Sequence, residues 1–337
     1  MLFRSLVVAS GACNLPDVPA IAEALPEGVT SLTSGPVEIE GHAVFQDSII
    51  VTYSTPTSFG EVGLVGDGEI APLTDFSAPL RSTGLLAPEE LTITGRDGYD
   101  IHGWVVTPAT AGPHPTLLMI HGGPYAAYSV HPLDEAQVYA DAGYAVVYCN
   151  PRGSAGYGQA HGRTIRGRMG TVDMHDVLDF LDGAIAAHLE LDESRLGILG
   201  GSYGGYLTAW TIAHDHRFAA AIVERGYLDP DAFIGSSDIG WFFGQEYNGY
   251  TAAERRAQSP QEVALDVTTP TLVIHSEDDL RCPLAQAETW YATVKLNGTP
   301  AELLIFPGEN HELSRSGRPR HRVQRFEAII EWFGRYL

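Results

Sequence analysis

Lysine is almost absent from this chain, because Lys295 is the only one among its 337 residues. Its positive charge therefore comes mainly from arginine, and 20 basic residues face 42 acidic ones, which leaves a formal net charge of −22. A field of that sign repels phosphate groups. We therefore expect no nucleic acid and no membrane surface among its partners.

Cysteine is also scarce. Cys13, Cys149 and Cys282 are odd in number, scattered and without the spacing of metal ligands. A disulfide framework and a structural zinc site are both disfavoured by that pattern, and a reducing compartment is favoured. The pair His214 and His216 is interpreted as a polar turn rather than a metal site. We expect no metal, no cofactor and a cytoplasmic location.

Long hydrophobic runs are missing too, since none approaches the ~20 residues that cross a bilayer. The segment 1–13 has a weak likeness to a signal or lipoprotein leader, but its apolar stretch is short and Ser10 stands where a lipobox has leucine. A buried strand around Leu6–Val8 explains the same residues, and we favour it.

Residues 1–85 have the pattern of an all-β segment. Short β-like runs at Ala43–Phe45, Ser48–Tyr53 and Glu61–Val65 are separated by Gly, Pro, Ser and Asp. The segment amounts to about two blades of a β-propeller, too few to close a ring. Because exposed strand edges invite pairing, we expect them to pack on the second domain or to be covered by a partner. A homo-oligomer or a missing propeller portion would supply such a partner.

Residues 86–337 alternate between apolar runs and helical patterns, which predicts a doubly wound, mostly parallel α/β sheet. Two runs, Leu91–Thr94 and Asp100–Val106, form an antiparallel opening pair. Six more apolar runs have the length and composition of buried strands: Thr116–Ile120, Ala145–Tyr148, Leu196–Leu199, Ala220–Val223, Thr271–Ile274 and Leu303–Phe306. Helices are expected over Asp134–Ala142, Asp173–Leu189, Leu284–Leu296 and Arg320–Leu337.

The most informative motif is Gly200-x-Ser202-x-Gly204, between a predicted strand and a predicted helix. This is the pattern of a nucleophile elbow, a sharp turn that lifts a serine Oγ clear of the sheet. Glycine two residues either side avoids collisions in the crowded turn. Gly-rich turns are common, so the strand–turn–helix context carries the prediction.

A serine nucleophile needs a base and an orienting acid, and both follow later predicted strands. The loop after Leu303–Phe306 contains His311, and the loop after Thr271–Ile274 contains Asp278 and Asp279. Each has an ordinary interpretation as a solvated loop residue or a turn. Together, in the order Ser, Asp, His, they match the α/β-hydrolase arrangement.

An oxyanion also needs donors placed in advance. The backbone N–H of Tyr203, at the start of the helix, is one candidate, and that of Gly123 in the loop His121–Pro124 is the second. The aromatic residues Trp241, Phe242 and Phe243 are candidates for an apolar substrate pocket, or equally for the core of a lid. Arg281 either binds a substrate carbonyl or pairs with a carboxylate.

Several motifs in this order resemble the prolyl oligopeptidase family of serine peptidases, and within it the acylaminoacyl-peptidase branch. They are His121–Pro124, Asn150–Gly158, Gly200–Gly205, Ser237–Trp241, Asp279-x-Arg281-x-Pro283 and His311. The resemblance covers residues 90–337. It implies Ser202 as nucleophile, Asp279 rather than Asp278 as acid, His311 as base, and Gly123 and Tyr203 as oxyanion donors. The chain differs from the family at its N-terminal end, where members usually carry a complete β-propeller and residues 1–85 resemble only its last part.

We therefore predict a serine peptidase that hydrolyses short peptides or N-acylated amino-acid derivatives through an acyl-enzyme. One alternative is a carboxylesterase, because the same site cleaves esters and the fold does not fix the substrate. Another is an inactive truncated fragment, or a subunit that works only within an assembly.

Overall fold

The computed structural model describes residues 32–46 and 48–337, which form two sheets. The first is an antiparallel meander of β1 (Glu38–Phe45), β2 (Ser48–Thr55), β3 (Ser58–Gly66) and β4 (Glu69–Pro72). It contains the three β-like runs predicted between residues 43 and 65, which are confirmed. The strand predicted at Leu6–Val8 lies outside the described residues.

Turn chemistry and one buried face account for this first sheet. Asp67 and Gly68, between β3 and β4, both have positive φ angles of 50° and 85°, as the tight turns of two-residue hairpins require. Val51 and Tyr53 alternate along β2 and are buried, whereas Val44 and Phe45 on β1 are exposed. The sheet is therefore only partly covered.

The second sheet has eight strands in the order β12-β11-β10-β9-β7-β8-β6-β5. Their bounds are β5 (Glu89–Thr94), β6 (Asp100–Val106), β7 (His114–Ile120), β8 (Ala145–Asn150), β9 (Leu191–Gly201), β10 (Ala220–Glu224), β11 (Thr271–Ser276) and β12 (Ala301–Phe306). β5, β6 and β8 pair antiparallel, and the other neighbours are parallel. The predicted α/β-hydrolase class, with its antiparallel opening pair, is confirmed.

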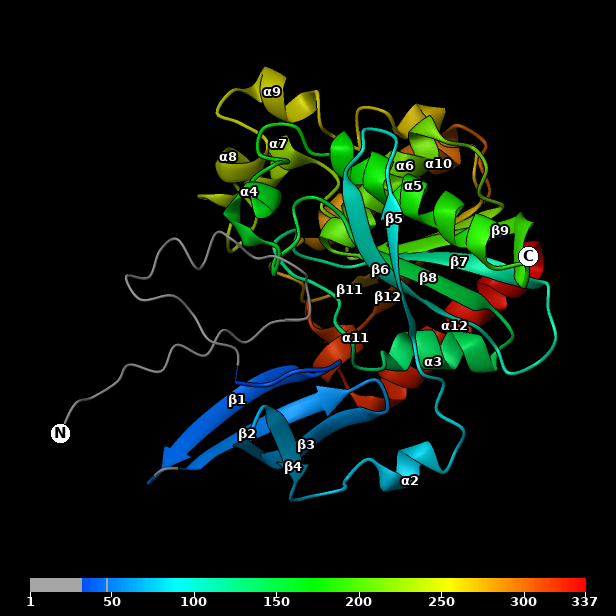
Figure 1. The fold of residues 1–337 in the computed structure, drawn as a ribbon. Coiled ribbons are helices and arrows are strands. Elements are labelled where there is room, and N and C mark those ends of the chain that lie inside the picture. The colour runs from blue at the N-terminus through cyan, green and yellow to red at the C-terminus, as the bar shows by residue number, and fades with distance from the viewer. Residues whose placement is uncertain (1–31, 47) are drawn as a thin grey trace.

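Helices cover both faces of this sheet (Figure 1). On one face lie α5 (Val172–Ala187), α6 (Tyr203–His214) and α10 (Leu284–Leu296), which contribute Val177, Leu207 and Trp290 to one apolar core. On the other face lie α3 (Asp134–Asp141) and α12 (Pro319–Tyr336), which contribute Tyr139 and Trp332 to a second core. The four long helices predicted from the sequence are confirmed within two residues of their ends.

Short helices gather around the carboxyl ends of the parallel strands. They are α4 (Gly158–Gly162), α7 (Pro230–Phe233), α8 (Phe243–Tyr247), α9 (Ala252–Arg256) and α11 (Leu313–Ser316), whereas the 3-10 turn η1 (Ala264–Asp266) precedes the amino end of β11. The carboxyl ends form the edge at which open α/β sheets carry their functional loops.

The two sheets are connected through α2 (Ala78–Arg81) and lie apart in Figure 1. The predicted boundary at 85/86 falls between the end of β4 and the start of β5. An ion pair joins the units, because Glu38 on β1 contacts Nδ1 of His131 in the loop before α3. Among the described residues, no helix combines the length and the apolar character that crossing a bilayer requires.

Candidate active site

Ser202 occupies a strained turn between β9 and α6. Its φ of 61° and ψ of −119° lie outside the regions that non-glycine residues commonly adopt. The neighbouring glycines explain how the turn fits. A Cβ at Gly204 would lie 2.2 Å from the carbonyl oxygen of Ile120, and one at Gly200 would lie 2.5 Å from the backbone of Gly204. The predicted elbow is therefore present in the structure.

His311 and Asp279 converge on this serine from two other loops. Nε2 of His311, after β12, lies 3.1 Å from Oγ of Ser202. Nδ1 of His311 lies 2.7 Å from Oδ2 of Asp279, after β11. Asp278, the other candidate, is exposed, and its backbone N–H donates to the carbonyl oxygen of Glu309. The geometry thus brings together Ser202, His311 and Asp279 and leaves Asp278 outside.

Main-chain N–H groups hold the carboxylate of Asp279 through the oxygen that does not contact His311. It is 2% exposed, and its Oδ1 accepts hydrogen bonds from the N–H groups of Arg281 at 2.9 Å and Cys282 at 2.8 Å. His275 lies beside it, with Nε2 donating to the carbonyl oxygen of Cys282 at 2.7 Å. Burial lowers the pKa of His275 and favours its neutral ring. Oδ2 of Asp279 therefore remains oriented toward His311.

The two predicted oxyanion donors lie beside the serine. Tyr203 is the first residue of α6, so its N–H has no acceptor within the helix. The loop after β7 approaches from the other side: a Cβ at Gly122 would lie 3.4 Å from Cβ of Ser202. Gly123 has a φ of 127°, which only glycine adopts readily. A Cβ at Gly123 would also lie 2.8 Å from the backbone nitrogen of Tyr125, so the tight turn of this loop requires glycine there.

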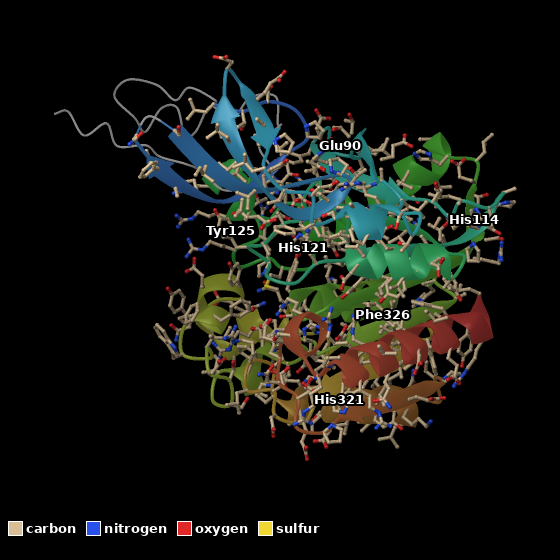
Figure 2. All side chains as sticks on the ribbon, turned by 90° about the horizontal axis from the view of Figure 1, so that it is seen from below. Glu90, His114, His121, Tyr125, His321 and Phe326 are labelled. Carbon is tan, nitrogen blue, oxygen red and sulfur yellow. The ribbon has the colours of Figure 1, made fainter. Side chains whose placement is uncertain are left out.

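His121 holds the same loop in place, a role that we did not predict from the sequence. Its Nδ1 donates to the carbonyl oxygen of Gly122 at 2.6 Å, and its Nε2 lies 2.9 Å from Oγ of Ser154. Burial lowers the pKa of His121 to about 4, so the ring is neutral at pH 7. In Figure 2, His121 and Tyr125 mark this loop, which lies in that view between the blue N-terminal sheet and the yellow short helices.

A cavity of about 600 Å³ opens at Ser202 and is lined on part of its wall by apolar side chains. These are Tyr203, Tyr227, Phe233, Ile239 and Phe243. Of the three aromatic residues predicted to line a pocket, only Phe243 does so.

The other two aromatic candidates lie outside the cavity wall. Trp241 is 74% exposed and Phe242 is 39% exposed. They occupy the short turn before α8, where their side chains reach solvent instead of the core. Arg281 lines the cavity and pairs with Asp238 at 2.7 and 3.1 Å. Pairing with a carboxylate was one of its two sequence interpretations.

Another part of the cavity wall is charged, which we did not predict from the sequence. Nε and Nη2 of Arg325 on α12 donate to the two carboxylate oxygens of Glu224 at 2.9 and 2.6 Å. Arg225, next to Glu224 at the end of β10, also lines the cavity. The available signal was the pair Glu-Arg directly after a buried strand, at the functional edge of the sheet.

Metal ligands are not clustered in the described part of the chain, where no group of three or more His, Cys, Asp or Glu side chains has suitable geometry. The chemistry that this geometry supports is nucleophilic. A serine hydroxyl is hydrogen-bonded to an imidazole, which is hydrogen-bonded to a carboxylate, and the serine lies at a helix N-terminus.

Comparison with known proteins also points to a peptidase. The model of the prolyl oligopeptidase family matches residues 130–337. The uncharacterized peptidase YuxL of Bacillus subtilis is 40% identical over 265 residues, which are 77% of this chain and 40% of that protein. The acylamino-acid-releasing enzyme of Arabidopsis thaliana is 32% identical over 237 residues, 66% of this chain and 30% of that enzyme.

Solved structures of similar sequence share the fold. The acylaminoacyl peptidase of Pyrococcus horikoshii superposes with a TM-score of 0.84 at 33% identity, over 91% of this chain and 50% of that one. An acylaminoacyl peptidase in complex with Z-Gly-Gly-Phe-chloromethyl ketone superposes with a TM-score of 0.86 at 32% identity, over 93% and 52%. The chain thus spans about half the length of these solved relatives.

Proposed function

The chain belongs to the prolyl oligopeptidase family, and we propose that it is a serine peptidase acting on short peptides or N-acylated amino-acid derivatives. The observation that carries the proposal is the hydrogen-bonded series from Ser202 through His311 to Asp279. Peptidases of this family and the acylaminoacyl peptidases that resemble the chain support it.

The proposed reaction has two halves. His311 takes the proton of Ser202 as the Oγ attacks the scissile carbonyl, and then gives it to the leaving amine. Asp279 holds Nδ1–H of His311 and stabilises the imidazolium. The backbone N–H groups of Tyr203 and Gly123 receive the developing oxyanion. Water, activated by the same imidazole, then releases the acyl group from Ser202.

The apolar part of the cavity wall supports a substrate with a nonpolar side chain on the acyl side. Tyr227, Phe233 and Phe243 pack edge to face in this region, so the surface offered to a ligand is preformed. Phe243 and Arg281 are the proposed substrate-binding residues that line the cavity. Trp241 and Phe242 are proposed only for parts of a peptide that extend to the surface.

Two measurements test the proposal. A fluorophosphonate probe should label the wild-type protein and leave Ser202→Ala unlabelled, while both unfold at similar temperature. Turnover of peptide anilides and nitrophenyl esters at matched concentration should reveal amide cleavage. Ester turnover with no amide turnover would establish the carboxylesterase alternative, and a folded wild type without label would establish the inactive-fragment alternative.

We also propose that the exposed edge of the N-terminal sheet is covered in the working protein by further propeller strands or a second copy of this chain. Exposed Val44 and Phe45 on the edge strand β1 support this, because an uncovered strand edge invites pairing. The mass of the purified chain in light scattering tests the second copy. A cytoplasmic location is proposed from the buried free thiols of Cys149 and Cys282, and cell fractionation tests it.

A further inference from the structure

Two buried arginines share the cavity with Ser202. Arg225 is 6% exposed and Arg325 is 2% exposed, and both line the cavity. Arg225 stands after β10 and Arg325 stands on α12, so the fold brings them together across 100 residues. Guanidinium groups at this depth need anionic partners, because burial of an unpaired charge is costly.

The two arginines differ in how many carboxylate contacts neutralise their charge. Arg325 holds Glu224 through two hydrogen bonds and also contacts Oε1 of Glu135 at 3.1 Å. Nη1 of Arg225 lies 2.7 Å from Oε1 of Glu224, the oxygen that already accepts from Arg325. Among the described residues, Glu224 is the only carboxylate in ion-pair contact with Arg225. Arg225 is thus the less neutralised cation.

The hydrogen-bonding of Arg225 is incomplete as well. Its Nε is buried without a hydrogen-bond partner in the described part of the chain, and its Nη1 has only the ion-pair contact with Glu224. Arg225 also has a φ of 39°, a region that side-chain-bearing residues rarely adopt. Strain and unsatisfied donors of this kind concentrate at functional sites.

The guanidinium lies directly against the nucleophile elbow. A Cβ at Gly201, the residue before Ser202, would lie 2.8 Å from Cζ of Arg225. Gly201 therefore leaves the space that the arginine fills. The remaining arginines of the cavity wall are paired: Arg281 has both oxygens of Asp238 as partners, and Arg315 has Glu312.

We propose that Arg225 is a substrate-binding residue that pairs with a carboxylate of the substrate held in this cavity. The inference rests on the proposed peptidase function and narrows its substrate class to short anionic peptides. A cavity of about 600 Å³ is large enough for a short peptide. The carboxylate comes either from the free C-terminus of the leaving group or from an acidic side chain on it, and the chemistry at Arg225 is the same.

Three matched peptides distinguish these sources in the wild-type protein: N-acetyl-Phe-Ala with a free carboxyl group, its C-terminal amide, and N-acetyl-Phe-Asp amide. We expect kcat/KM to be at least about tenfold higher for one of the two anionic peptides than for the neutral amide, the size of a hydrogen bond to a charged group. Preference for the first identifies the C-terminus, and preference for the third identifies the side chain. Equal kcat/KM for all three would overturn the inference.

Variants then locate the effect. Arg225→Met should remove the preference for the anionic peptide, and Arg225→Lys should keep part of it. Arg335→Gln is the matched control, because Arg335 lies on α12 with exposed ion pairs to Glu302 and Glu331 and away from the cavity. A wild-type preference that survives in a folded Arg225→Met would contradict the assignment. If that variant fails to fold, the wild-type peptide comparison and Arg225→Lys decide.

The test also separates this inference from the function on which it rests. A wild-type protein that takes the fluorophosphonate label and cleaves all three peptides equally would be a peptidase without an anion site. A protein that takes no label and cleaves none would overturn both.

Discussion

The backbone N–H of Ser202 donates a hydrogen bond of 3.0 Å to the carbonyl oxygen of Glu224. This bond joins the strained turn after β9 to the end of β10. The side chain of Glu224 continues the connection to α12 through Arg325. The main-chain conformation of Ser202 is therefore supported by a buried ion pair on its neighbouring strand.

Removing one partner of this ion pair should destabilise the fold strongly. Arg325→Met leaves the carboxylate of Glu224 buried with less compensation, and breaking a buried pair in this way costs about 3–5 kcal/mol. The free energy of unfolding in urea measures the effect. Arg335→Gln, on the same helix but half-exposed, should change it by about 0.5 kcal/mol or less. Equal effects of the two substitutions would contradict the structure.

The same ion pair gives a pH dependence. Burial raises the pKa of Glu224, but Arg325 and Arg225 outweigh burial and lower that pKa to about 2. Since the folded value lies below the ordinary one of about 4.3, Glu224 stabilises the fold above that pH. The contribution is lost as the pH falls toward 2.

Glu224→Gln isolates this effect from that of the other carboxylates. We expect the variant to be less stable than wild type at pH 7, and the difference between their free energies of unfolding to shrink from pH 5 toward pH 2. A difference that stays constant over this range would show that Glu224 does not titrate with folding.

Asp279→Asn should reduce catalysis without unfolding the protein. An amide at this position can favour the wrong tautomer of His311, and kcat should fall on the order of 10³–10⁴-fold. Asp278→Asn is the matched control, since Asp278 is the adjacent, exposed residue with the same side chain. Steady-state hydrolysis of a peptide anilide compares them. A larger loss in Asp278→Asn would reverse the assignment of the acid.

Tyr203→Phe distinguishes the role of the backbone N–H of Tyr203, the proposed oxyanion donor, from the role of its phenol. The phenol donates to Oδ2 of Asp173 at 2.7 Å in the core, and burial raises the pKa of Asp173. Loss of this bond should lower the free energy of unfolding by about 1–3 kcal/mol. Because the N–H remains, kcat should stay within about threefold of wild type. A large fall in kcat with unchanged stability would assign the catalytic contact to the phenol.

The fold class and the residues Ser202, Asp279 and His311 of the candidate active site could be predicted from the order of residues alone. Apolar runs such as Thr271–Ile274 predict strands that are buried on both faces. The pattern Gly200-x-Ser202-x-Gly204 can be recognised in the sequence because close packing of the turn excludes a Cβ at the two glycines. The positions of Asp279 and His311 after later strands follow from the rule that loops at one sheet edge carry function.

Which side chains share the cavity could not be predicted in the same way, because it depends on packing between distant elements. Arg325 reaches Glu224 because α12 packs across the sheet, and no local pattern in either segment encodes that distance. Trp241 and Phe243 are two residues apart in one aromatic run, yet one faces solvent and the other the cavity, because their direction depends on a short turn packed against other loops. Periodicity in a sequence records burial along one element, whereas contacts between distant elements arise from packing.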